Sequence, residues 1–138
     1  MALSAPRRIG IRVVLAGLLV VVISAIGWTL FVLIYGMLTG TTVRESAPHY
    51  GAIFGVAAGA IGSIGMGYWA ARRTPRPLLV GFMVGLAYAI LQAGVSILLA
   101  AAPLVGILAR SAAGLIGGMV GGGIASGPNK SLERTRGR

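Results

Sequence analysis

Few side chains in this sequence are able to do chemistry, and they lie far apart. The 138 residues include one histidine, two carboxylates and no cysteine. Acid–base catalysis needs a histidine or carboxylate beside its substrate, nucleophilic catalysis needs a serine or cysteine beside a base, and a metal site needs several ligands on one face. No such group can be assembled here. We therefore expect a protein that is not an enzyme and that has no catalytic residues, metal site or cofactor.

One ionisable residue, Arg110, lies inside a long apolar run. An arginine at the bilayer centre costs about 2.5–3.5 kcal/mol on insertion scales, so such residues are functional candidates. Gln92 and Ser96 are expected at a similar depth on the neighbouring run, with His49 and Tyr50 at the outer end of another. These residues predict a polar vestibule open to the outside, with the guanidinium in direct or water-bridged reach of Gln92, Ser96 or a backbone carbonyl. Alternatively, Arg110 extends to the outer headgroups and hydrogen-bonds Gln92.

Hydropathy indicates which elements must position these residues. The chain is 57% hydrophobic and only 10% charged, whereas an ordinary soluble domain has about 25% charged residues. A helix needs about 20 apolar residues to cross about 30 Å of hydrocarbon. Four such runs predict an all-α bundle of four transmembrane helices within residues 11–126, between a basic N-terminus, residues 1–10, and a basic tail, residues 127–138. The runs are Ile11–Leu38, His49–Ala71, Pro77–Ala101 and Pro103–Ser126.

Arginine and lysine residues are concentrated on one side of this bundle. They precede the first run, separate the second from the third, and follow the fourth, whereas the other two connections hold only Arg44, which Glu45 offsets. Because cytoplasmic loops are enriched in these residues, both termini are predicted to be cytoplasmic, in a multi-pass protein of the bacterial cytoplasmic membrane. The same groups are candidates for contacts with anionic lipids. They are Arg7, Arg8 and Arg12; Arg72, Arg73 and Arg76; and Lys130, Arg134, Arg136 and Arg138.

Glycines recur every four residues along three of the runs, which places them on one face of each helix. In water each would weaken its helix by about 1 kcal/mol relative to alanine. In lipid, such faces allow close backbone approach, which drives helix association. We therefore expect glycine-zipper packing, with Trp28 of the first run filling one of the glycine grooves. The candidate packing residues are Gly51, Gly55, Gly59 and Gly67 of the second run, Gly81 and Gly85 of the third, and Gly114, Gly118 and Gly122 of the fourth.

The segment "GYWAARRTPRPLLVGFMVGLAYAIL", residues 67–91, contains a glycine-rich helix end, an Ala-Ala-Arg connection and a G-x-x-x-G-x-x-Y pattern made by Gly81, Gly85 and Tyr88. It resembles the centre of a family of small four-span bacterial membrane proteins of uncharacterised function. The resemblance extends over the second to fourth runs. It implies the four-span topology and no activity.

Two functions fit these observations. The preferred one is an accessory or assembly subunit of a larger membrane complex, because the chain lacks catalytic groups and its glycine faces suit partner helices. The alternative is a small oligomeric channel or carrier for an anion or polar solute, because of Arg110 and its polar neighbours. The expected partners are the lipid bilayer and other transmembrane helices, in a hetero-complex or a homo-oligomer. Nucleic acid is not expected, since the net charge of +10 is dispersed over ends and loops.

Overall fold

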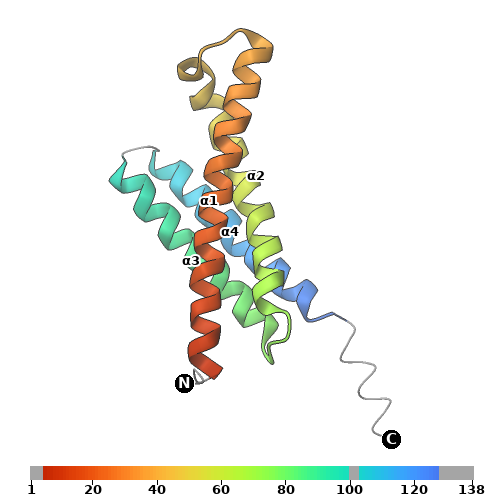
Figure 1. Ribbon diagram of the computed structural model, residues 1–138. Helices are drawn as coiled ribbons and strands as arrows, with labels where there is room; N and C mark the ends of the chain where they lie inside the picture. Colours follow the sequence, from red (N-terminus) through yellow and green to blue (C-terminus); the bar gives the residue numbers. More distant parts are fainter. Residues whose placement is uncertain (1–4, 100–102, 128–138) are drawn as a thin grey trace, which may run out of the picture.

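The computed structural model describes residues 5–99 and 103–127, and within these the side chains of residues 5–7, 43–49, 51 and 52 are left out of the description. The described chain is entirely helical apart from its short connections (Figure 1). The helices are α1 (Ala5–Thr39), α2 (Val43–Ala71), α3 (Pro77–Leu98) and α4 (Leu104–Ala125). Each is long and apolar enough to cross a membrane. The prediction of an all-α chain with four long apolar helices is therefore confirmed.

Two helices begin earlier than their apolar runs. Helix α1 begins at Ala5 instead of Ile11 and includes the first basic residues. Helix α2 begins at Val43 instead of His49, so Arg44 and Glu45 lie in its first turn and not in a loop. Hydropathy detects only the apolar part of a helix. A polar first turn in water or at the headgroups has the same backbone hydrogen bonds, so the helix begins before its apolar run does.

The boundaries of α3 and α4 follow from their prolines. Pro77 is the first residue of α3, where its fixed φ suits a helix and its missing N–H would have no intrahelical partner. Pro103 precedes α4 in an extended conformation, with φ −65° and ψ 153°. At the other end, the backbone N–H of Ser126 donates to Gly122 and Gly123 and closes the last turn of α4.

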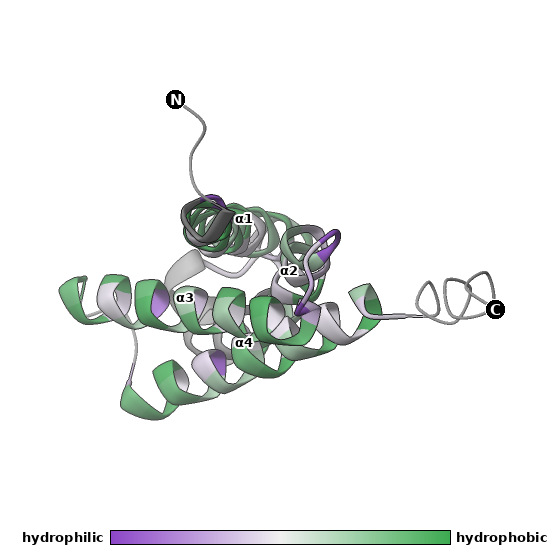
Figure 2. Ribbon diagram, turned by 90° about the horizontal axis from the view of Figure 1, so that it is seen from below, coloured by the Kyte–Doolittle hydropathy of each residue, from purple (hydrophilic) through white to green (hydrophobic). Residues whose placement is uncertain are grey.

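The helices form two crossing pairs. Figure 2 shows α1 and α2 nearly end-on, whereas α3 and α4 lie across the view. Helix α4 packs mainly on α2 and α3, and α1 packs on α2 and α3. Within the described ranges, α1 and α4 make no direct packing contact. The start of α1, the α2–α3 connection and the end of α4 lie at the same end of the molecule (Figure 1).

Helix α4 contacts its two neighbours through two rows of glycines. Toward α3, a Cβ atom added at Gly122 would lie 2.6 Å from the carbonyl oxygen of Pro77. Toward α2, a Cβ atom at Gly117 would lie 2.5 Å from the carbonyl oxygen of Ala60. Real Cβ atoms do not come this close to backbone. Both interfaces therefore require glycine. Reading the sequence at intervals of four from Gly114 follows only the row with Gly118 and Gly122, so it does not find the second row, which includes Gly117 and Gly121.

Helices α1 and α2 extend together beyond the adjoining ends of α3 and α4 (Figure 1). Aromatic rings join this projecting pair. Phe31 of α1 stacks on Phe54 of α2 with ring centroids 4.6 Å apart, and Tyr35 lies 4.8 Å from Tyr50. Stacking of this kind contributes about 0.5–1.5 kcal/mol per pair beyond burial.

Candidate functional site

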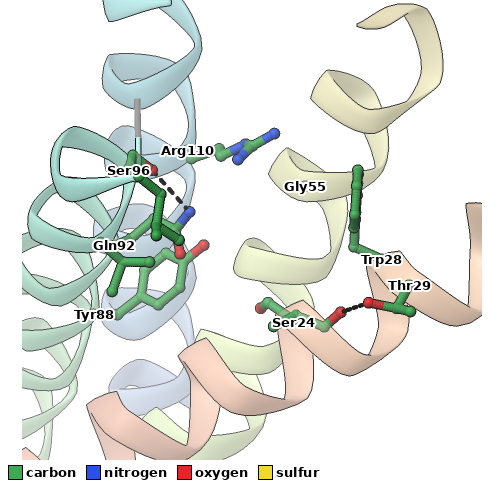
Figure 3. A pocket seen from close by; sticks show the side chains of 11 residues that line it. Ser24, Trp28, Thr29, Gly55, Tyr88, Gln92, Ser96 and Arg110 are labelled. Carbon is green, nitrogen blue, oxygen red and sulfur yellow. Dashed lines mark hydrogen bonds between the residues drawn. The ribbon is translucent and has the colours of Figure 1, made fainter. Parts of the chain in front are cut away.

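A cavity of about 320 Å³ lies where the paired helices α1 and α2 diverge from α3 and α4. All four helices contribute to its wall, and its polar side chains come from α1, α3 and α4 (Figure 3). Leu99, which is largely exposed, belongs to its rim at the end of α3. We call it the Arg110 cavity. Its lining residues are Ser24, Ala25, Trp28, Thr29, Gly55, Tyr88, Gln92, Val95, Ser96, Leu99 and Arg110.

The guanidinium of Arg110 reaches from α4 to the backbone of α2. Figure 3 shows the side chain extending away from α3 toward the helix that carries Gly55. A Cβ atom added at Gly55 would lie 2.6 Å from Nε and 2.8 Å from Cζ of Arg110. Gly55 thus provides the space in which the guanidinium lies, and Arg110 is half-buried. A charged group is thereby held inside the bundle by a contact that only glycine permits.

Tyr88 forms the floor of the cavity and contacts three other helices. It is 1% exposed. Its ring lies over Gly114 of α4, its hydroxyl lies over Gly59 of α2, and its backbone N–H is close to Gly17 of α1. Two glycines, Gly114 and Gly59, therefore enclose this aromatic side chain, and Gly17 lets α1 approach the backbone of α3 beside it. The ring is fixed by packing, and its hydroxyl is left near the cavity.

The remaining polar groups line the α3 and α1 walls. The amide Nε2 of Gln92 donates to Ser96 Oγ over 3.4 Å along one turn of α3. Thr29 donates its hydroxyl to the carbonyl oxygen of Ala25 over 2.9 Å. Ser24 is 9% exposed, and its hydroxyl lies close to that of Tyr88. The two hydroxyl groups therefore join the α1 and α3 walls of the cavity.

The structure brings three of the five predicted polar residues to this cavity, namely Arg110, Gln92 and Ser96. Arg110 is directed at α2, whereas Gln92 pairs with Ser96 (Figure 3). Tyr50 lies in the aromatic stack with Tyr35 and is not among the lining residues. The side chain of His49 and the surroundings of Gly51 lie outside the described part of the chain.

Trp28 lines the cavity together with Gly55 of α2, and its packing in a glycine groove stays a prediction. Sequence reasoning also missed Ser24, Thr29 and the central position of Tyr88. A serine and a threonine in an apolar run are weak signals on their own. The available signal was the spacing of Ser24 and Trp28, which are four residues apart and therefore share one side of α1.

The arrangement brings several hydrogen-bonding side chains and one charge around a single space. One guanidinium, one phenol, one amide and three hydroxyl side chains line the space. Among the residues that the structure describes, no group of three or more histidine, cysteine or acidic side chains could hold a metal ion. A guanidinium with neighbouring hydroxyl donors recognises an anion or a hydrogen-bond acceptor. Ala25, Val95 and Leu99 form an apolar part of the cavity wall.

No family model, curated protein or solved structure matches this chain. The functional argument therefore rests on the geometry of the cavity and of the helices around it.

Proposed function

We propose that this protein is a non-enzymatic integral membrane protein that binds an anion or polar solute in the Arg110 cavity, as a carrier or as the binding unit of a small channel. One observation carries the proposal: Arg110, Tyr88, Gln92 and Ser24, from three helices, surround a single space of about 320 Å³. Pocket volumes of about 300 Å³ and above are typical of small-molecule sites.

The position of the glycines favours this function over the accessory subunit. Gly59, Gly118 and Gly122 are buried against the chain's own helices. Those faces are therefore not available for a partner helix. We infer that the glycine contacts act as a glycine zipper in the membrane, where close packing takes the place of a hydrophobic force between helices.

The proposed setting is the bacterial cytoplasmic membrane with both termini inside. Support comes from the arginines at the start of α1 and in the α2–α3 connection, which lie at one end of the bundle, combined with the positive-inside rule. In this orientation the rim of the cavity at Leu99 is on the outer side. The solute would then enter from outside or from the outer half of the bilayer.

The test is an anion titration of the purified full-length protein in lipid nanodiscs. Sulfate, inorganic phosphate and acetate are added at constant ionic strength while thermal unfolding is followed. We expect at least one of them to raise the melting temperature, because a ligand of the folded state stabilises it. Arg110→Leu should abolish the rise, and Arg110→Lys should weaken it because the planar fork is lost.

Arg8→Gln is the matched control, since Arg8 is an exposed arginine of α1 outside the cavity. It should leave the titration unchanged. An identical response of the wild type and Arg110→Leu to all three anions would overturn the proposal.

A second function, the accessory subunit, is favoured by the projecting ends of α1 and α2. The apolar part of α1 runs from Arg8 to Thr39, which is about 48 Å at 1.5 Å per residue and exceeds the hydrocarbon thickness of about 30 Å. Near its end Met37 and Leu38 are at least 80% exposed. Another protein would cover such an apolar extension.

Purification from the native membrane in mild detergent separates the two functions. Stoichiometric co-purification of another protein, lost when Met37 and Leu38 are both changed to serine, supports the subunit. A chain that purifies alone and responds to anions through Arg110 supports the binding protein.

A further inference from the structure

A second, smaller concave site lies where α1 passes the end of α2. Arg12 of α1 and Arg72 and Arg73 of the α2–α3 connection line it together with Trp69, around a volume of about 80 Å³. We call these four residues the basic hollow. None of them lines the Arg110 cavity, so this site is independent of the function proposed above.

Packing of α1 on α2 brings residues far apart in the sequence to this site. Val13 and Ala16 of α1 belong to one buried cluster with Ala70 and Ala71 of α2. Both alanines are 1% exposed, and their small side chains let α1 pass close to the end of α2. Arg12 precedes Val13 in this part of α1, and its exposed side chain lines the hollow beside the α2–α3 connection.

The connection itself directs two successive arginines to the hollow. The backbone N–H of Arg72 donates to Tyr68 over 2.9 Å and continues the helical turn. Arg73 then adopts a φ of 68°, a left-handed conformation that is unfavourable for a residue with a side chain. Thr74 fixes this turn, because its N–H and its hydroxyl both donate to the carbonyl oxygen of Ala71, over 3.1 and 2.6 Å.

Three guanidinium groups around so small a volume repel one another. The chain has only two acidic residues, Glu45 and Glu133. Glu45 lies in the first turn of α2, at the opposite end from Arg72, and Glu133 lies outside the described residues. An anion with several acceptor oxygens relieves the repulsion, and a phosphate matches the planar fork of arginine with paired hydrogen bonds.

Apolar side chains lead from the hollow along both helices. On α1, Leu15 and Leu19 are exposed on the same side as Arg12. On α2, Ile61 is exposed on the same side as Trp69, and the space beside Gly65, between them, is open. Tryptophan is enriched where headgroups meet hydrocarbon. A ligand with a phosphate in the hollow and long apolar chains on these surfaces satisfies both features.

We propose that the basic hollow binds the phosphate of an anionic phospholipid, with its acyl chains against the exposed apolar residues of α1 and α2. Basic pockets between transmembrane helices are suited to such headgroups. Free phosphate offers the same charged group without the chains, so the experiment distinguishes the two sources.

The experiment uses the full-length protein, purified in detergent and stripped of lipid. Its melting temperature is measured with phosphatidylglycerol, with phosphatidylcholine, and with inorganic phosphate at matched concentration. The three additions are made to the Arg110→Leu variant, in which the Arg110 cavity no longer binds anions, and in it we expect phosphatidylglycerol to give the largest rise and inorganic phosphate to give none. Equal effects of the two phospholipids would overturn the proposal. A rise with inorganic phosphate as large as that with phosphatidylglycerol would overturn the lipid part of it.

Substitutions test whether the effect of phosphatidylglycerol arises at the basic hollow. Arg12→Gln and Arg72→Gln should each weaken the apparent affinity for phosphatidylglycerol more than about fivefold, because each loses paired hydrogen bonds to the phosphate in addition to one charge near the membrane surface. Arg76→Gln, an exposed arginine of the same connection outside the hollow, is the matched control and should have a smaller effect. A uniform loss for all three variants would indicate surface charge alone and would overturn a built site.

Arg73→Gly separates binding from folding. Glycine adopts a positive φ without strain, so the variant should be at least as stable as the wild type in phosphatidylcholine. It should nevertheless lose about fivefold in affinity for phosphatidylglycerol, because a guanidinium is missing. Retention of bound phosphatidylglycerol in native mass spectrometry gives a second readout. Unchanged retention in both Arg73→Gly and Arg12→Gln would contradict the site.

Discussion

The guanidinium of Arg110 lies on Gly55, so close that a Cβ atom at position 55 would be 2.6 Å from Nε. A residue without a side chain on α2 therefore determines where the charge of α4 is held. Because the neighbouring atoms belong to the far part of a flexible side chain, a substitution at Gly55 should move the arginine without separating the helices.

Gly55→Ala tests this relationship. The added methyl group should displace the guanidinium from its position and weaken anion binding about tenfold, with a change in stability below about 1 kcal/mol. Anion titration and thermal unfolding of the same samples give the anion affinity and the change in stability. Gly94→Ala, where nothing lies within 4 Å of the added atom, is the control. Unaltered anion binding in Gly55→Ala would show that the position of Arg110 does not matter.

The glycines between α3 and α4 should be much less tolerant. A Cβ atom at Gly118 would lie 2.8 Å from the backbone nitrogen of Gly85, and backbone cannot rotate aside. We expect Gly118→Leu to destabilise the protein in detergent by about 1–3 kcal/mol or more, the usual cost of overpacking. Gly94→Leu should change the melting temperature little. Equal stability of the two variants would disprove the close-packing argument.

Tyr88 and Gly59 should be energetically coupled. The Tyr88 hydroxyl lies over Gly59, and a Cβ atom there would be 3.0 Å from the Tyr88 Cζ. Gly59→Ala should therefore destabilise the wild type more than it destabilises Tyr88→Phe, in which the hydroxyl is absent. A double-mutant cycle of unfolding free energies should give a coupling of about 0.5–3 kcal/mol. Additive effects would mean that the two residues do not constrain each other.

The sequence predicts the long elements of this protein better than its sites. Four apolar runs and the prolines at 77 and 103 locate α3 and α4 closely, because crossing hydrocarbon requires continuous apolar helix. The glycine period also indicates which residues of α4 are small enough for close contact. It does not indicate that α4 uses two rows at once, since Gly114 and Gly117 face different neighbours only after three helices have packed.

The sites depend on how the helices cross. Gln92 and Ser96 were expected at the depth of Arg110 by counting residues from a turn, and both line the same cavity. Counting residues does not show, however, toward which helix a side chain points, and Arg110 extends toward Gly55 of α2. Arg12 and Arg72 meet only because Ala70 and Ala71 let α1 approach α2. No local pattern in the sequence predicts that contact.

Membrane orientation remains a prediction and has a direct test. Because the chain has no cysteine, Ser46→Cys and Thr74→Cys each create one labelling site without a change of background. Position 46 lies near the start of α2 and position 74 in the α2–α3 connection, at opposite ends of one helix. With the arginines of that connection in the cytoplasm, a membrane-impermeant maleimide should label position 46 in intact cells and position 74 only after the membrane is opened.

Thr74→Cys removes the hydroxyl that donates to Ala71, so Pro75→Cys serves as a second reporter of the same side. Labelling of positions 74 and 75 in intact cells would reverse the orientation and place the rim of the Arg110 cavity on the cytoplasmic side.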